Sequence, residues 1–429
     1  MFPSDAASRI SQTSTRDVRR RVGAGGAVRR RDGGAVLVHV AVAMLGLLAF
    51  SALTIDLGSL WVARAQAQNA ADAGALAGGV ALAYVNPSDT EAARAAAAAI
   101  VQQHQVWGEA VGPASLETNA GTCPAGAPSI PGTCLQVRVS RGTVSGTPLP
   151  VFFSRLFGVN AADVAASASA KVMVGNAAPC VRPIALVDRW NDRYDRVAPG
   201  SGWTEADLYE GYDASGNPNL PPGTGDAYDP PQASGPGTGI TVADMAGVEI
   251  VRTIFDPHWP QPIAGGSMLA LDLPRPGSEG APETFRYEDN IASCSGVPLG
   301  LGESATAFYP HRNFYTIRPI EQLIDSDRNA IWDPTRRAVM NSAFSVSPRI
   351  IILPVIDPDA FSRQVRTGTA VVEARVRNLV GFFVQGVSES AAGEVQLRGV
   401  LVPTAGRFDA AAPQISEEAA FLRTVALVR

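Results

Sequence analysis

Residues 35–55 constrain this chain more than any other stretch, because they form a run of 21 residues in which His39 is the single ionisable side chain. A helix needs about 20 mainly apolar residues to cross the hydrocarbon core of a bilayer. Eleven of these residues are Val, Leu, Ile or Phe. Together they favour insertion by roughly 3 to 7 kcal/mol, which outweighs one imidazole. We therefore predict a transmembrane helix over residues 34–57.

The charges on either side of the span predict its orientation. Eight arginines and three aspartates lie within residues 1–33, whereas Arg64 is the one basic residue in the twenty residues after the span. Because basic flanks stay in the cytoplasm, we predict a single-pass protein with a cytoplasmic tail and a periplasmic or extracellular bulk. Two other interpretations stay open, a twin-arginine export signal at residues 29–31 and signal-peptidase cleavage after Ala65.

The helix is expected to continue beyond the membrane, because no proline interrupts residues 56–84 and helix-favouring residues dominate them. Ala70, Gly74 and Gly78 give this extension a face with almost no bulk. Small residues four apart let another backbone approach closely. The face is either a helix-helix assembly surface or a surface that packs on the protein's own ectodomain.

The residues at and after the end of the span carry a family resemblance. The run RRRDGGAV, followed by IDLGSLWVARAQAQNAADAGALAGG, resembles the N-terminal signature of TadE/TadG-like proteins of the Flp (tight adherence) pilus system. The matching positions are Asp56, Gly58, Arg64, Gln68, Asn69, Ala70, Ala71, Asp72, Ala75, Leu76 and Ala77.

This resemblance implies a membrane-anchored, pilin-like envelope component that has no enzymatic activity. The implied partners are the inner membrane, pilin, pseudopilin-like proteins and the assembly platform. One position departs from the pattern, since His39 stands where TadE-type members and Flp pilins have a glutamate five residues after a cleavable glycine, here Gly34. The departure favours the TadG-like branch and leaves processing after Gly34 open.

Residues 58–176 are predicted to form a pilin-like αβ domain around the helical extension. A capping-box spacing at Ser88–Glu91 opens a second helix over roughly 89–106. Alternating apolar residues predict two strands, and an amphipathic segment predicts a short helix between them. The strands are expected at 135–139 and 164–174, and the short helix at 149–158.

Residues 177–429 are predicted to form a mostly β domain, which makes the whole chain an α+β protein. Residues 197–240 are rich in Gly and Pro and are expected to be a loop insertion. Helices are expected near 319–324 and 334–344. The expected strands are 248–254, 267–273, 349–355, 370–376, 381–387 and 395–402.

Four cysteines on the exported side favour disulfides, because the periplasm is oxidising. The pairing that we favour joins Cys123 to Cys134 and Cys180 to Cys294. Three connectivities are possible, and a zinc site is the competing interpretation, although no CxxC pair is present.

The composition points away from nucleic acid, since the net charge is −5 and no basic patch follows the N-terminal tail. We find no nucleophile-base pair or phosphate-binding loop, and we expect no cofactor. The fragment at Asp325 begins like a calcium loop but has Ala330 in place of the required glycine. The sequence therefore predicts a structural component of a Flp/Tad-type pilus assembly or secretion machine.

An anchored surface adhesin or glycan-binding protein is the alternative of a different class. This alternative is based on a group of aromatic residues in and beside the acidic, proline-rich loop. These residues are Trp190, Trp203, Tyr209, Tyr212 and Tyr228.

Overall fold

The computed structural model describes residues 33–84, 90–121, 123, 132–193, 202–213, 215, 217–218, 225–256 and 262–428. The basic tail, the capping residues Ser88 and Asp89, and His258 therefore lie outside the described residues. A long apolar helix is followed by a mostly β region, which confirms the predicted α+β class.

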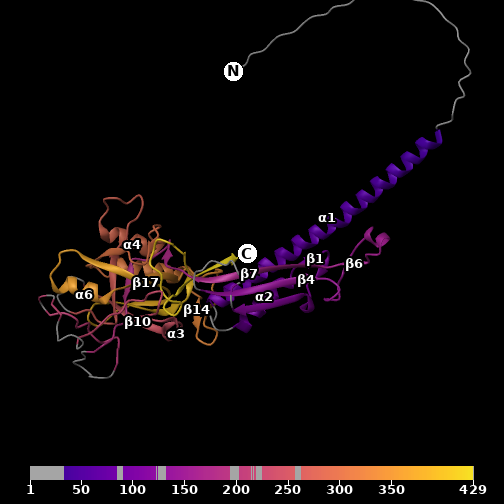
Figure 1. Cartoon of the computed structure of the whole chain (residues 1–429). Helices are drawn as coiled ribbons and strands as arrows, with labels where there is room; N and C mark the ends of the chain where they lie inside the picture. Colours follow the sequence, from indigo (N-terminus) through magenta and orange to yellow (C-terminus); the bar gives the residue numbers. More distant parts are fainter. Residues whose placement is uncertain are drawn as a thin grey trace, which may run out of the picture.

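Helix α1 (Gly33–Tyr84) is one continuous helix of 52 residues. Figure 1 shows its N-terminal half projecting alone from the rest of the molecule, while its C-terminal half lies along a sheet. Within residues 36–55 the large apolar side chains are exposed, with exposed fractions between 52% and 73%. In the described part of the chain, α1 is the one helix long and apolar enough to cross a membrane. This finding fits a single-pass membrane protein.

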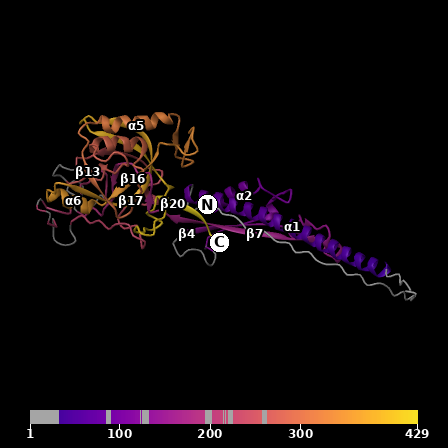
Figure 2. The same cartoon turned by 90° about the horizontal axis from the view of Figure 1, so that it is seen from above.

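Helix α2 (Thr90–Val101) runs against α1 (Figure 2) and is shorter than the predicted helix. The chain turns after Val101, and Trp107 and Gly108 adopt positive φ angles of 52° and 76°. These angles allow β1 (Gln105–Val106) to pair with β2 (Glu109–Ala110) in a short hairpin.

A five-stranded sheet packs against α1 and α2, with the strand order β19-β20-β7-β4-β3. Its paired strands β4 and β7 match the two predicted strands: β7 has the predicted bounds, and β4 is longer than the predicted 135–139. Strand β20 comes from the C-terminal end of the chain and was not predicted. The strands are β3 (Leu116–Gly121), β4 (Gly132–Arg141), β7 (Val164–Val174), β19 (Thr404–Ala405) and β20 (Leu422–Val428). We call α1 from residue 57, α2 and this sheet the stalk unit.

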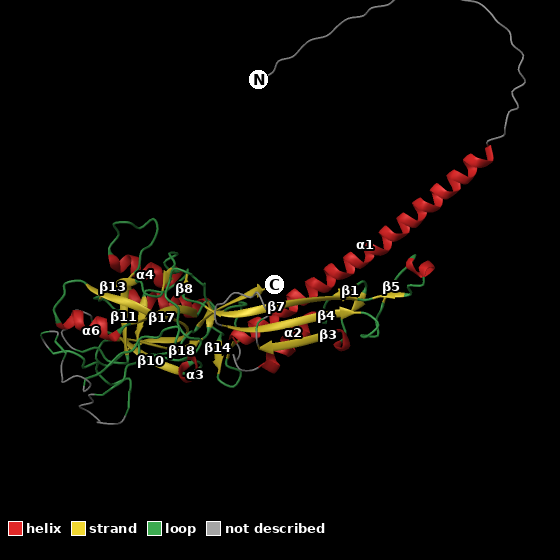
Figure 3. Cartoon of the chain, in the orientation of Figure 1, coloured by secondary structure: helices red, strands yellow, loops and turns green. Residues whose placement is uncertain are grey.

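Between β4 and β7 the chain forms an arm beside α1 (Figure 3). The predicted amphipathic helix over 149–158 is wrong in extent, because residues 149–150 form a strand. The arm consists of β5 (Leu149–Pro150), the 3-10 helix η2 (Ser154–Phe157) and β6 (Ala161–Ala162).

The remaining strands form a seven-stranded sheet with the order β10-β18-β17-β13-β11-β9-β16. Both edge strands also pair with an interior strand, β10 with β11 and β16 with β17, so the sheet curls back on itself at both ends. The two strands predicted at 370–376 and 381–387 are one long strand, β17, with an irregularity at residues 384–386. The bounds are β9 (Ile184–Val187), β10 (Glu249–Ile254), β11 (Ser267–Asp272), β13 (Ser304–Phe308), β16 (Ile350–Ile356), β17 (Val372–Glu389) and β18 (Val395–Val402).

This sheet has a core on each face, because successive side chains of a strand point to opposite sides. Ile184 and Leu186 of β9 belong to one core, and Ala185 and Val187 to the other. The first face is covered by α4 and α5, and the second by α6 together with Trp190, Tyr209, Tyr212 and Ile263. The helices are α3 (Val242–Met245), α4 (Glu283–Ser293), α5 (Phe314–Ser326) and α6 (Pro358–Arg366). We call this assembly the C-terminal unit.

The helix predicted near residues 334–344 is wrong, because the chain forms a β hairpin there. Strand β14 (Ile331–Asp333) pairs with β15 (Ala338–Met340). Arg337 and Asn341 have φ angles of 49° and 59°, which an α-helix excludes. One further short pair joins β8 (Ala177–Ala178) to β12 (Leu299–Gly300).

The structure pairs Cys123 with Cys134 and Cys180 with Cys294, which is the connectivity favoured from the sequence. Their Cα atoms lie 5.0 and 5.2 Å apart, within the usual range for a disulfide. The first bridge lies at the start of β4, and the second joins the start of the C-terminal unit to the end of α4.

Candidate functional site: the small-residue face of α1 and its arm

The C-terminal half of α1 is a core element of the stalk unit. Ala63, Ala67, Ala71 and Ala75 are fully buried, as is Ala70. They pack with the inward side chains of β4 and β7, which are Leu135, Val137, Val139, Ala166, Ala168 and Ala170. Because alanine has a single methyl group, the helix lies close to the sheet.

Gly74 and Gly78 bring α2 and β4 still closer to α1. A Cβ atom at Gly78 would overlap Leu135 Cδ2 and lie 2.8 Å from the carbonyl oxygen of Ala93. At Gly74 it would overlap Val101 Cγ2. Of the two interpretations left open, the structure therefore shows packing on the protein's own ectodomain. A partner helix would have to displace α2 to reach these glycines.

Asp56 holds the arm against α1. Its side chain is only 2% exposed. The carboxylate accepts hydrogen bonds from the backbone N–H groups of Phe152 at 3.0 Å, Phe153 at 3.1 Å and Ser154 at 2.7 Å, and from Ser154 Oγ at 2.6 Å. An ionised carboxylate makes strong hydrogen bonds, so this residue fixes where the arm lies along the helix.

The polar residues that follow Asp56 in the family resemblance lie on a more solvent-exposed side of α1. Gln68 Nε2 donates to Asp72 Oδ1 at 2.7 Å and to the carbonyl oxygen of Ser167 at 3.2 Å. Arg64 and Gln68 line an open groove of about 600 Å³ together with Arg138 of β4. Gly58 and Asn69 are exposed, and apart from the local helix backbone no atom of the described residues lies within 4 Å of where a Cβ of Gly58 would be.

Two further side chains, Gln66 of α1 and Arg141 of β4, hold the hairpin of β1 and β2, and no sequence pattern pointed to them. Gln66 Oε1 accepts a hydrogen bond of 2.6 Å from the backbone N–H of Trp107. Arg141, at the end of β4, is 9% exposed and donates to the carbonyl oxygens of Val106, Trp107 and Thr147. Both side chains stabilise loop backbone, which a sequence pattern does not reveal.

One known family model matches the helix that makes these contacts, α1. The model described as putative Flp pilus-assembly TadE/G-like matches residues 34–81. Residues 34–81 are a Tad-like segment. The match includes the apolar half of α1, Asp56 and the glycines of the buried face, and it confirms the family resemblance of this stretch. No curated protein and no solved structure matches the chain.

The aromatic residues that motivated the adhesin alternative lie in the C-terminal unit, away from the Tad-like segment. Trp190, Tyr209 and Tyr212 are between 2% and 8% exposed and belong to one of its two cores. Trp190 makes edge-on contacts with Tyr209 at 5.4 Å and with Trp203 at 5.7 Å. Tyr228 donates from its hydroxyl to Asp188 Oδ2 at 2.8 Å. Trp190, Tyr209 and Tyr212 therefore belong to the core, and Trp203 and Tyr228 are partly buried against it.

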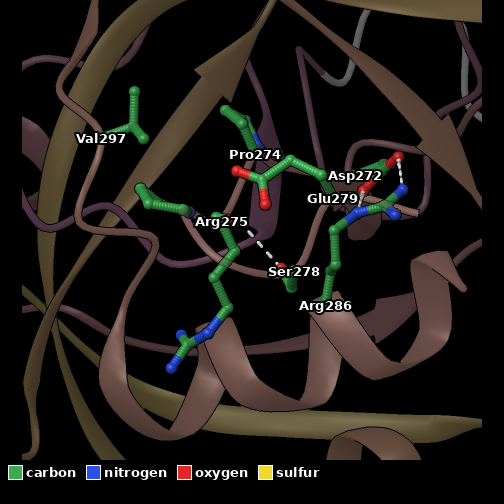
Figure 4. Close-up of a pocket in the computed structure, with 8 residues that line it drawn as sticks. Asp272, Pro274, Arg275, Ser278, Glu279, Arg286 and Val297 are labelled. Atoms are coloured by element: carbon green, nitrogen blue, oxygen red, sulfur yellow. Dashed lines mark hydrogen bonds and ion pairs between the residues drawn. The ribbon is translucent and has the colours of Figure 1, made fainter. Parts of the chain in front are cut away.

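A pocket of about 460 Å³ lies between the end of β11 and α4, outside the Tad-like segment (Figure 4). Two of its charged groups, Asp272 and Arg286, form an ion pair. Arg286 donates to both carboxylate oxygens of Asp272, at 2.9 and 2.5 Å, and this contact raises the pKa of Arg286. Arg275 donates to Ser293 Oγ and to the carbonyl oxygen of Cys294. The arrangement stabilises the segment around α4.

The fragment that begins like a calcium loop is part of another hydrogen-bonded turn. Asp327 accepts hydrogen bonds from Ser342 Oγ, from Ser347 Oγ and from the backbone N–H of Ala343, and these bonds lower its pKa. Among the described residues, no group of three or more His, Cys, Asp or Glu side chains is placed to hold a metal ion.

Proposed function

We propose that this protein is a single-pass, membrane-anchored structural component of a Flp/Tad-type pilus assembly machine, closest to the TadG-like branch. The observation that supports this most is the coincidence of three features on α1. The family match, the exposed apolar half and the half that is built into an ectodomain all fall within one helix.

In this proposal the inner membrane holds residues 34–57, the arginine-rich tail is cytoplasmic and both folded units lie on the periplasmic side. The protein then acts through contacts with pilin, pseudopilin-like proteins or the assembly platform, and catalysis has no part in its role. The arginine excess before the span supports this orientation.

The contact surface proposed from the sequence needs revision, because α2 and β4 cover Gly74 and Gly78. Leu76 and Val80 lie four residues apart on the uncovered side of the same helix, with exposed fractions of 38% and 48%. Residues at this spacing share one face of a helix. We place the partner contact on this pair.

The test uses the bacterium that carries the gene. An in-frame deletion should abolish Flp pili on electron micrographs, and a plasmid copy should restore them. A copy with Leu76→Gln and Val80→Gln should be expressed at the normal level and yet restore few pili, because the exposed apolar face is lost while the fold keeps its core.

The matched control is Val251→Gln, which removes an apolar side chain that is 43% exposed on β10 of the C-terminal unit. This variant should restore normal piliation. Normal pili in the deletion strain would refute the proposed function. Normal pili with the Leu76 and Val80 variant would refute the contact surface alone.

A further inference from the structure

The arm carries exposed apolar side chains at its far end. Phe152, Phe153 and Val159 have exposed fractions of 57%, 37% and 49%. We call these three residues the aromatic tip. Soluble surfaces rarely gather large apolar side chains at the end of a protruding loop unless something covers them.

The position of the aromatic tip along α1 is fixed by the chain itself. Asp56 accepts hydrogen bonds from the backbone of Phe152, Phe153 and Ser154, and these bonds hold the tip at the level of Asp56. Figure 1 shows β6 and the turn before it beside the middle of α1. The contact pairs residues about 100 positions apart in the sequence.

Asp56 directly follows the apolar run of residues 35–55. At a rise of about 1.5 Å per residue this run is roughly 31 Å long, which is about the thickness of the hydrocarbon core of a bilayer. The carboxylate, and with it the aromatic tip, is therefore placed where hydrocarbon gives way to lipid headgroups.

Two other side chains suit the interface between hydrocarbon and headgroups. Trp61 is 74% exposed and lies five residues beyond Asp56, about 8 Å further along the helix. Tryptophan is enriched at membrane-water interfaces. Arg155 in η2 is exposed beside the aromatic tip, where a guanidinium suits an anionic phosphate.

We propose that the aromatic tip inserts into the outer interface of the same bilayer that α1 crosses, with Arg155 at the headgroups. The protein then touches the membrane at two places, and Asp56 is a positioning residue that joins them. Two contacts prevent the ectodomain from rotating freely about the axis of α1, so the membrane sets which side of the stalk unit faces a neighbour. The inference rests on the membrane anchor of the proposed function and on none of its partners.

The test places the photoreactive analogue p-benzoylphenylalanine at single positions of the full-length protein, purified and reconstituted in vesicles of phosphatidylcholine with phosphatidylglycerol. After irradiation, lipid adducts are measured by mass spectrometry. The analogue at Phe152 should form lipid adducts on the order of tenfold more often than at Phe285, because a tethered side chain meets lipid at a high effective concentration. Phe285 is the matched control, since it is 56% exposed on α4 of the C-terminal unit.

The analogue at Val42, within the apolar run, reports on the anchor separately. Adducts at Val42 and Phe152 support the inference. The inference is overturned if the analogue forms lipid adducts at Val42 but no more of them at Phe152 than at Phe285. It is also overturned if the analogue at Phe152 crosslinks to a second copy of the chain. In both cases the anchor stays intact. Failure at Val42 overturns the anchor and the inference together.

Asp56→Ala tests the positioning role. With the analogue at Phe152, this variant should lose most of its lipid adducts, since the arm is no longer held at the membrane level. Adducts at Val42 and the urea midpoint of the C-terminal unit should stay the same. Undiminished adducts at Phe152 would show that Asp56 does not position the aromatic tip.

Discussion

The two units of this protein solve the packing problem with different residues. In the stalk unit, α1 presents alanine and glycine to its neighbours. Its backbone therefore lies close to α2 and the sheet, and few large side chains fill the space between them. In the C-terminal unit, two cores are filled with residues such as Tyr209, Tyr287, Phe361 and Phe382 on the faces of one sheet. The comparison indicates that the face of α1 around Gly74 and Gly78 has no room for added volume, whereas the C-terminal unit depends on large side chains, buried polar groups and a disulfide that closes a long loop.

The two disulfides give the largest expected difference between the units. Cys180 and Cys294 are 114 residues apart in sequence, and Cys123 and Cys134 are 11 apart. On a chain-entropy model the long bridge stabilises its unit by about 5 kcal/mol and the short one by about 3 kcal/mol. Replacing both cysteines of each pair by serine and measuring urea unfolding should show this order. An equal loss for the two pairs would contradict it.

Glycine-to-leucine substitutions sharpen the comparison within α1. Gly78→Leu should destabilise the stalk unit by more than about 3 kcal/mol, because the new side chain overlaps Leu135 and the backbone of Ala93. Gly58→Leu is the control on the same helix, and it should change stability by less than about 1 kcal/mol because no neighbour lies within 4 Å. Thermal unfolding of the detergent-solubilised protein measures both. Similar melting temperatures for the two variants would contradict the packing.

A buried carboxyl group makes the C-terminal unit sensitive to pH. Asp188 accepts hydrogen bonds from the backbone N–H groups of Ile240 and Arg189 and from the Tyr228 hydroxyl. Burial raises its pKa to about 6, despite these bonds. Since the unfolded chain loses this proton near pH 4, rising pH favours unfolding until the folded state also ionises near pH 6.

The stability contributed by neutral Asp188 is therefore present below pH 4 and lost between pH 4 and pH 6. Asp188→Asn removes this dependence. The difference in unfolding free energy between wild type and variant should shift by about 2 to 3 kcal/mol between pH 4 and pH 7, with wild type relatively weaker at pH 7. Urea unfolding followed by tryptophan fluorescence measures it. A pH-independent difference would show that Asp188 titrates normally.

The sequence predicted the parts of this fold that depend on local patterns. The apolar run predicted the start of α1, alternating residues predicted β7, and a hydrophobic segment predicted β18. It did not predict β20, because a strand pairs with whichever edge the fold presents, and that edge is about 250 residues earlier in the chain. A helix was predicted where the structure has the hairpin at residues 331–340, because the positive φ of Arg337 is uncommon for arginine and the sequence does not signal it.

The candidate site was predicted in part for a similar reason. The resemblance singled out Asp56, Gln68 and the small residues, but the sequence alone left open whether a partner or the protein's own sheet covers Gly74 and Gly78. The backbone groups that Asp56 holds lie about 100 residues away, and one sequence contains no pattern that joins them. Contacts of this kind need the folded structure.

The central claim is that α1 lies in two environments: residues 36–55 lie in lipid, and residues 67–83 pack in the stalk unit. Hydrogen exchange of the protein in vesicles, measured by mass spectrometry over a urea series, tests it most directly. Peptides from residues 67–83 should lose protection at the same urea concentration as β4 and β7, while peptides from residues 36–55 stay protected. Loss of protection in residues 36–55 together with the sheet, or in residues 67–83 well before it, would contradict the account.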